Sequence, residues 1–136
     1  MTKRKKAFAM LVIAILLLIL ELLPYGVVLD FAHMSPDLTV RYYQQHFSYF
    51  DPIVYGYGHF GPFITAILTC LLTIVSVIHV FADHRAIRMI LSATSFLTFL
   101  VSLTPILTGC YSSLGGIISV LLFATFMISL KKEETI

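Results

Sequence analysis

The sequence predicts an all-α membrane protein, a bundle of four transmembrane helices with a folded, aromatic-rich first extracellular loop. Of its 136 residues, 59% are hydrophobic and only 12% are charged, whereas soluble domains are about 45–50% apolar and about 25% charged. The apolar residues form long runs, and the Lys and Arg residues lie at the ends of these runs. A chain of this length is expected to form a single membrane domain, residues 1–136.

The transmembrane helices are expected at about residues 7–23, 62–81, 87–107 and 112–130. A spanning helix needs about 20 apolar residues, and residues 89–130 are 42 uncharged residues in succession. Thr104-Pro105 and Thr108-Gly109 interrupt this run. Because proline and glycine mark turns, we interpret the run as two helices joined by a tight hairpin.

The first helix follows the basic segment Lys3-Arg4-Lys5-Lys6, which is also how a secretory signal peptide begins. Cleavage would need small residues after the apolar stretch, but the chain continues as Glu21-Leu22-Leu23-Pro24-Tyr25. We therefore expect an uncleaved membrane anchor.

The distribution of Lys and Arg predicts the orientation of the chain. Eight of the nine basic residues precede the first span, flank the loop between spans two and three, or follow span four, and only Arg41 lies on the other side. Cytoplasmic segments carry the Lys and Arg excess. Both termini are therefore expected in the cytoplasm of a cell whose plasma membrane holds the protein as a multi-pass protein.

Polar residues inside the spans give the first candidate site. Only 14 uncharged residues, Ala7 to Leu20, precede Glu21. They make about 21 Å of helix, which is shorter than the hydrocarbon layer of about 30 Å, so Glu21 is expected in the outer part of the membrane. A carboxylate at this depth is a candidate functional residue; the structural alternative is an interfacial anchor that bonds to loop amides or to Arg41.

Ser and Thr residues recur at helical spacing on spans two, three and four, for example at Thr65, Thr69 and Thr73. Such hydroxyl faces are typical of helix packing in membranes. The alternative is a polar path for a solute, but hydroxyl groups without charges or amides make a poor path.

The outer loop, residues 25–61, contains six tyrosines and four phenylalanines. Disordered segments are poor in aromatic residues, so we expect this loop to fold over the outer end of the bundle, with a short interfacial helix at Arg41–Phe47. Contiguous aromatic surface usually marks a partner or the membrane. The candidate interaction residues, together with Glu21, are Arg41, Tyr49, Phe50, Tyr57 and His59.

Two other interpretations of the loop are weaker. Its His and Asp residues match no metal-ligand spacing, so no metal site is expected. Gly56-Tyr57-Gly58 resembles part of a potassium-channel filter, but Val54 and Tyr55 stand where a filter has Thr-Val.

The segments Glu21-Leu22-Leu23-Pro24-Tyr25-Gly26, Phe47-Ser48-Tyr49-Phe50, Gly56-Tyr57 and Gly61-Pro62-Phe63-Ile64-Thr65 resemble a group of small, uncharacterised bacterial four-span membrane proteins. The resemblance covers roughly residues 21–75. It implies a bacterial plasma membrane and no assigned activity. The claudin-type tetraspan proteins are similar in topology only, because this chain lacks their Trp motif and their loop cysteine pair.

These observations favour an accessory or interaction protein that uses its aromatic outer loop to bind a partner or lipid. The alternative is a small transporter or channel subunit that uses Glu21 and the Ser/Thr-lined helix faces. The sequence has no nucleophile–base pair, metal cluster or cofactor motif, so we expect no enzyme and no cofactor. The expected partners are the lipid bilayer and another membrane protein or a second copy of this chain, with no nucleic acid.

Overall fold

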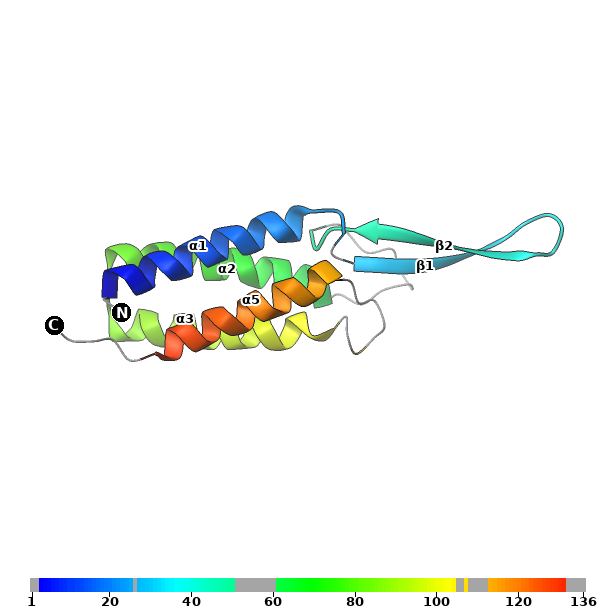
Figure 1. Ribbon diagram of the computed structural model, residues 1–136. Helices are drawn as coiled ribbons and strands as arrows, with labels where there is room; N and C mark the ends of the chain where they lie inside the picture. Colours follow the sequence, from blue (N-terminus) through cyan, green and yellow to red (C-terminus); the bar gives the residue numbers. More distant parts are fainter. Residues whose placement is uncertain (1–2, 26, 51–60, 105–106, 108–112, 132–136) are drawn as a thin grey trace.

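The structure is a computed structural model and describes residues 3–25, 27–50, 61–104, 107 and 113–131. Its elements follow in the order α1 (Lys3–Leu22), β1 (Val27–Met34), β2 (Val40–Phe47), α2 (Gly61–Phe81), α3 (Arg85–Ser102) and α5 (Ser113–Leu130). The four helices lie side by side as an elongated bundle, and the two strands extend from one end of it (Figure 1). The first residues of α1, the α2–α3 turn and the last residues of α5 lie at the opposite end. We call the end that carries the strands the hairpin end, and the opposite end the basic end.

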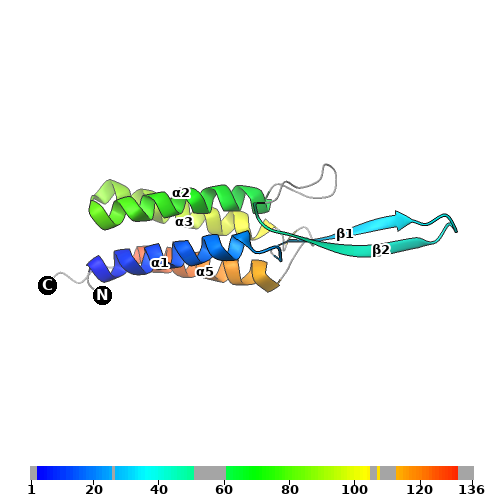
Figure 2. The ribbon, with the colours of Figure 1, turned by 90° about the horizontal axis from the view of Figure 1, so that it is seen from above.

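The helices form a closed ring in which each packs against two neighbours: α1 and α3 both contact α2 and α5 (Figure 2). Three of the helices, α2, α3 and α5, are long and apolar enough to cross a membrane. The expected all-α membrane class is therefore confirmed at this level, as a mostly helical chain with three helices that could span a bilayer. The expected turn between the last two helices lies largely outside the described residues.

Hydroxyl groups occupy much of the buried faces of α2 and α3. Thr65, Thr69 and Ser76 of α2, and Ser95 and Thr98 of α3, are all buried. Each donates a hydrogen bond to the carbonyl group one turn earlier in its own helix. Because these hydroxyls are satisfied locally, the helices approach closely without exposing unpaired polar groups, as in other membrane bundles.

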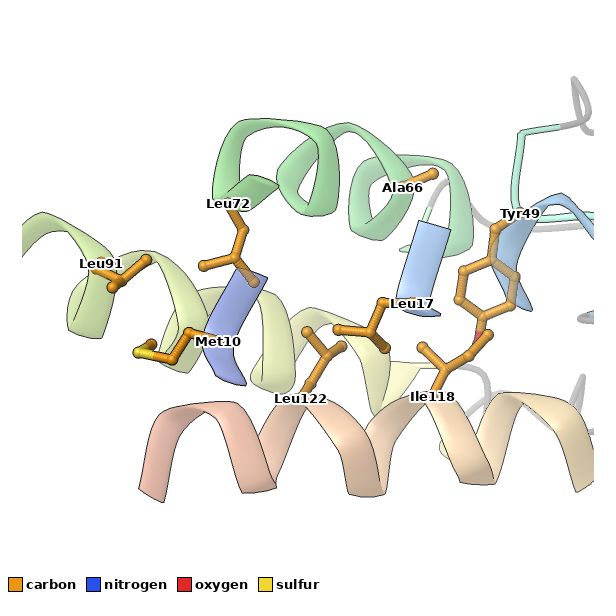
Figure 3. Close-up of a cluster of buried hydrophobic side chains, with 8 residues drawn as sticks. All are labelled: Met10, Leu17, Tyr49, Ala66, Leu72, Leu91, Ile118 and Leu122. Atoms are coloured by element: carbon orange, nitrogen blue, oxygen red, sulfur yellow. The ribbon is translucent and has the colours of Figure 1, made fainter. Parts of the chain in front are cut away.

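The apolar core runs along the axis of the ring. It contains Met10 and Leu17 of α1, Ala66 and Leu72 of α2, Leu91 of α3, and Ile118 and Leu122 of α5, all almost fully buried. Tyr49 closes this core at the hairpin end, where its ring extends toward Ile118 (Figure 3). The residue thus belongs to the bundle although it follows the hairpin in sequence.

The expected helix at Arg41–Phe47 is wrong, because these residues belong to β2. β2 pairs antiparallel with β1, in a register from Val27 opposite Phe47 to Met34 opposite Val40. Valine, tyrosine and phenylalanine favour extended backbone, and the pairing satisfies backbone groups that a short isolated helix would leave open. The loop residues Tyr57 and His59, and the Gly56-Tyr57-Gly58 motif, lie outside the described residues.

The turn of the hairpin is closed by its own hydrogen bonds. The backbone N–H of Ser35 donates to the carbonyl of Thr39 at 3.0 Å, and that of Leu38 donates to the carbonyl of Ser35 at 3.0 Å. The two hydroxyl oxygens of Ser35 and Thr39 are 2.6 Å apart. Leu38 has a φ of 60°, in the left-handed region that favours glycine.

Candidate functional site

Glu21 lies in the last turn of α1 and is fully buried at the hairpin end of the bundle. Its Oε1 accepts a hydrogen bond of 2.8 Å from Thr69 Oγ1, which joins α1 to α2. Its Oε2 is buried and has no hydrogen-bond partner among the described residues. A carboxylate that is withdrawn from water is costly unless its oxygens are paired. Within the described residues, only one of the two carboxylate oxygens of Glu21 has a hydrogen-bond partner.

The hydroxyl group of Thr69 lies within hydrogen-bonding distance of two acceptors. Its Oγ1 lies 2.8 Å from Oε1 of Glu21 and 2.9 Å from the carbonyl oxygen of Thr65. A hydroxyl group has a single hydrogen to donate. The two contacts therefore compete for it, which leaves the carboxyl group of Glu21 still less completely satisfied.

Tyr49 covers the carboxyl group from the loop side. Its backbone N–H donates a 3.1 Å hydrogen bond to the backbone carbonyl of Glu21, and its side chain is fully buried. The phenol oxygen has no hydrogen-bond partner among the described residues. Burial, and secondarily the negative charge of Glu21, raises the pKa of the Tyr49 phenol well above its usual range, so this ring stays neutral.

The segment Ser48–Phe50 therefore acts as an anchor for the hairpin. Ser48 is buried like Tyr49, and Phe50 is half-buried against the core cluster. Because β2 ends at Phe47, the position of these three residues determines where the hairpin leaves the bundle. Truncation of the Tyr49 or Phe50 side chain would disturb the bundle itself.

Comparisons with known protein families, with curated proteins and with solved structures each find no match to this chain.

The surface of the hairpin presents aromatic residues away from the bundle. Tyr42 is 76% exposed and Tyr43 is 52% exposed, on the two faces of β2. Near the base of the hairpin, the Tyr25 ring meets His46 edge-to-face at 5.8 Å. The described part of the chain thus places aromatic surface on an element that projects beyond the helices (Figure 1).

The expected contact between Glu21 and Arg41 is not made. Arg41 is the second residue of β2 and pairs in register with His33, near the tip of the hairpin. It is six residues from Phe47, or roughly 20 Å at about 3.3 Å per residue. The cation is therefore exposed near the tip, far from the buried carboxylate.

The structure brings together three of the residues that the sequence indicated, Glu21, Tyr49 and Phe50, and separates Arg41 from them. Sequence reasoning treated Thr69 as one member of a packing stripe and did not pair it with Glu21. The sequence places Glu21 and Thr69 at a similar depth, in the outer halves of their spans, but does not show that the two side chains face each other. Within the described ranges, no three His, Cys, Asp or Glu residues are grouped to hold a metal ion.

Proposed function

We propose that this chain is a membrane-anchored interaction protein that binds a partner protein on the outer side of the membrane through the β1–β2 hairpin. The observation that carries the proposal is the exposure of Tyr42 and Tyr43 on an element that projects from the bundle. Tyrosine is enriched at protein interfaces, because its ring supplies apolar contact area and its hydroxyl a hydrogen bond. Their exposure leaves both rings accessible to a partner.

The architecture of the hairpin suggests how the partner binds. A two-stranded hairpin is marginally stable alone, and within the described residues each strand has a single neighbouring strand. The outer edge of each strand therefore offers backbone donors and acceptors. We propose that an extended segment of the partner adds a strand at one edge, while Tyr42 and Tyr43 contact its side chains.

We further propose that α1 is a fourth span, which makes the chain a four-helix multi-pass protein with residues 25–61 as its outer loop. α1 packs between α2 and α5, both of which are apolar enough to span. Its 20 residues measure about 30 Å, the thickness of the hydrocarbon layer. The basic residues at its start would reach the headgroups.

The proposed orientation has both termini in the cytoplasm and the hairpin outside. Lys3, Arg4, Lys5, Lys6, Arg85, Arg88 and Lys131 belong to the basic end, whereas Arg41 is near the hairpin tip. This asymmetry supports a cytoplasmic basic end. The resemblance of residues 21–75 to small bacterial four-span proteins favours a bacterial plasma membrane.

The test is a photocrosslinking experiment in intact cells, with a photoreactive amino acid at Val40. Crosslinked products from the unaltered hairpin are compared with those from Tyr42→Ser combined with Tyr43→Ser. The matched control is Gln44→Ser combined with Gln45→Ser, which changes two exposed residues of the same strand. We expect the tyrosine variant to lose at least about 90% of one defined protein adduct, because aromatic anchors dominate binding energy, and the glutamine variant to keep it.

Equal adduct in both variants would show that the tyrosines do not bind the partner. An adduct with the mass of two chains would show that the hairpin binds a second copy of this chain and not a different protein. Adducts with lipid alone would show that the hairpin lies on the membrane surface.

A second function is favoured by the incomplete hydrogen bonding of Glu21. A buried carboxyl group with one oxygen unpaired in the described structure has the character of a binding site for a proton or a cation in a small transporter. Under this alternative, Glu21→Gln in proteoliposomes abolishes solute flux while the helical circular dichroism is retained. Full flux in the variant would eliminate the role.

A further inference from the structure

The tip of the β1–β2 hairpin carries exposed apolar side chains, those of Met34, Leu38 and Val40. Met34 and Val40 are opposite each other in the register of the two strands, so they lie on the same face of the hairpin. Because side chains alternate along a strand, the exposed ring of Tyr42 lies on that face as well. An apolar surface therefore extends from the proposed binding face to the tip.

Leu38 occupies a position in the turn at which glycine is the usual residue. The backbone N–H of Ser35 donates to the carbonyl of Thr39. The loop between these two residues therefore consists of residues 36–38. In hairpin loops of three residues, the last one commonly adopts the left-handed conformation and is commonly glycine. Leu38 adopts this conformation, with a φ of 60°.

Packing within the chain does not explain the leucine. Its side chain is 80% exposed, and glycine would adopt the same backbone conformation without strain. Residues held in such conformations cluster at functional sites. What leucine provides and glycine lacks is an apolar side chain on the loop between β1 and β2, which is the part of the hairpin farthest from the helices (Figure 1).

The loop is held in this conformation by hydrogen bonds at its base. The N–H of Leu38 donates to the Ser35 carbonyl at 3.0 Å. The Ser35 hydroxyl oxygen lies 2.6 Å from the hydroxyl oxygen of Thr39 and 3.3 Å from its carbonyl oxygen. Pro36 fixes one further backbone dihedral angle. Because the loop is ordered before a partner arrives, little backbone entropy is lost when its side chains are bound.

An apolar pocket in a partner protein fits these observations better than a lipid bilayer does. Asp37, the neighbour of Leu38 in the loop, is exposed, and a carboxylate is costly to place in hydrocarbon. The strands also extend beyond the end of the bundle, away from the membrane that the helices would span (Figure 2). A protein pocket can accept the leucine and present a cation to the neighbouring carboxylate.

We propose that Leu38 is an anchor residue that inserts into an apolar pocket of the partner protein, with a cationic group of the partner facing Asp37. This inference rests on the proposed function, because it names a contact in the same complex of hairpin and partner. Met34 and Val40 pack against the rim of the pocket, and their face continues to Tyr42. The strained turn keeps the leucine exposed and ready to bind.

The test uses the full chain in intact cells, with a photoreactive amino acid at Gln44. This residue is exposed and lies on the face of Tyr42, away from the tip, so the tip itself stays unaltered. The variants are Leu38→Gly and Leu38→Ala. The matched control is Leu38→Met, which keeps an apolar side chain of similar volume at the same position. Expression is kept low, so that the yield of the protein adduct follows binding.

We expect the yield of the protein adduct to fall about tenfold or more in Leu38→Gly and Leu38→Ala, because truncation of a buried leucine removes its apolar contacts. The yield from Leu38→Met should stay within about threefold of the unaltered chain. Hydrogen exchange of the β2 amides, measured on the purified variants, should show that the hairpin of Leu38→Gly is at least as well folded as the original. Loss of the adduct in that variant then cannot come from unfolding.

Asp37→Asn tests the second contact. It should lower the yield of the protein adduct about threefold, because the loop loses its charge interaction with the partner. An unchanged yield would overturn the assignment of a cation opposite this carboxylate.

The outcomes separate this inference from the proposed function. If Tyr42→Ser with Tyr43→Ser loses the protein adduct while Leu38→Gly and Leu38→Ala keep it, the hairpin binds a partner without the tip, and only this inference is overturned. If the unaltered chain gives no defined protein adduct, both fail. Equal loss in Leu38→Met and Leu38→Ala would overturn the apolar pocket. Adducts with lipid or with a second copy that depend on Leu38 would overturn the choice of a partner protein.

Discussion

The backbone N–H of Tyr49 donates a 3.1 Å hydrogen bond to the backbone carbonyl of Glu21, and so joins the segment after the hairpin to the last turn of α1. The same two residues bury a phenol and a carboxyl group at the same end of the bundle. The hairpin leaves α1 at one side of this contact and returns to the bundle at the other. Its two ends are therefore held together by residues that belong to neither strand.

Loss of the Thr69 hydroxyl should destabilise the bundle. Thr69→Val keeps the shape of the side chain but removes the donor to Glu21 Oε1. We expect the free energy of unfolding to fall by about 1–3 kcal/mol, because a buried polar group loses its partner. Detergent-induced unfolding followed by circular dichroism measures the change.

The control is Thr73→Val, whose hydroxyl donates to the Thr69 carbonyl of its own helix. Its effect should stay within about 0.5 kcal/mol. Similar losses in the two variants would show that the contact between α1 and α2 adds nothing.

Alkaline pH should weaken the bundle through Tyr49. The pKa of this phenol is raised above its usual value of 10.0 by burial and then by the charge of Glu21. The stabilisation is fully present below the unfolded pKa of about 10 and is lost as pH rises from there toward the folded-state pKa. Between about pH 9 and about pH 12, the free energy of unfolding should fall more steeply for the unaltered chain than for Tyr49→Phe.

At neutral pH, Tyr49→Phe should be neutral or slightly stabilising, because the hydroxyl has no partner within the described residues. Parallel pH curves for the two chains would contradict the role of the phenol.

Removal of the Lys6 ammonium should loosen the end of α5. Lys6→Met keeps the aliphatic stem but loses the donors to the carbonyl oxygens of Ser129 and Lys131. Hydrogen bonds from charged groups contribute about 1.5–3 kcal/mol, so the last turn of α5 should exchange its amide hydrogens at least about tenfold faster. Hydrogen exchange read by mass spectrometry measures this, with Lys5→Met at an exposed position as the control.

Glycine at position 38 should stabilise the hairpin. Leu38 is 80% exposed and has a φ of 60°, a conformation that costs a residue with a Cβ about 1–2 kcal/mol. Leu38→Gly should therefore slow amide exchange in β2, whereas Leu38→Ala, which keeps the Cβ, should not. Faster exchange in the glycine variant would show that the leucine side chain supports the turn.

The helices were predictable because their signals are local. Residues 62–81 form an apolar run of membrane length after Pro62, and Pro105 and Gly109 divide the last run into two. The depth of Glu21 could also be inferred, since only Ala7 to Leu20 precede it. Its pairing with Thr69 could not, because a contact between α1 and α2 depends on the rotation of both helices about their axes.

The hairpin was missed although its sequence carried a signal. Val27–Met34 and Val40–Phe47 are rich in valine and aromatic residues, and Pro36 and Asp37 mark a turn between them. The aromatic residues were interpreted instead as part of a short interfacial helix at Arg41–Phe47 and as surface for a partner or the membrane. Tyr49 was expected to be an interaction residue of the outer loop, but its ring is buried in the core cluster, which is a tertiary effect that composition does not encode.

The contact between α1 and α5 has a consequence for biogenesis. The first helix leaves the ribosome early, yet the carbonyl groups that receive the Lys6 ammonium are the last part of the bundle to be synthesised. Until α5 has been synthesised, the side of α1 that packs against it has no partner. Assembly therefore ends with a contact of high sequence separation, and a chain that stops before α5 would leave this side of α1 uncovered and prone to aggregate.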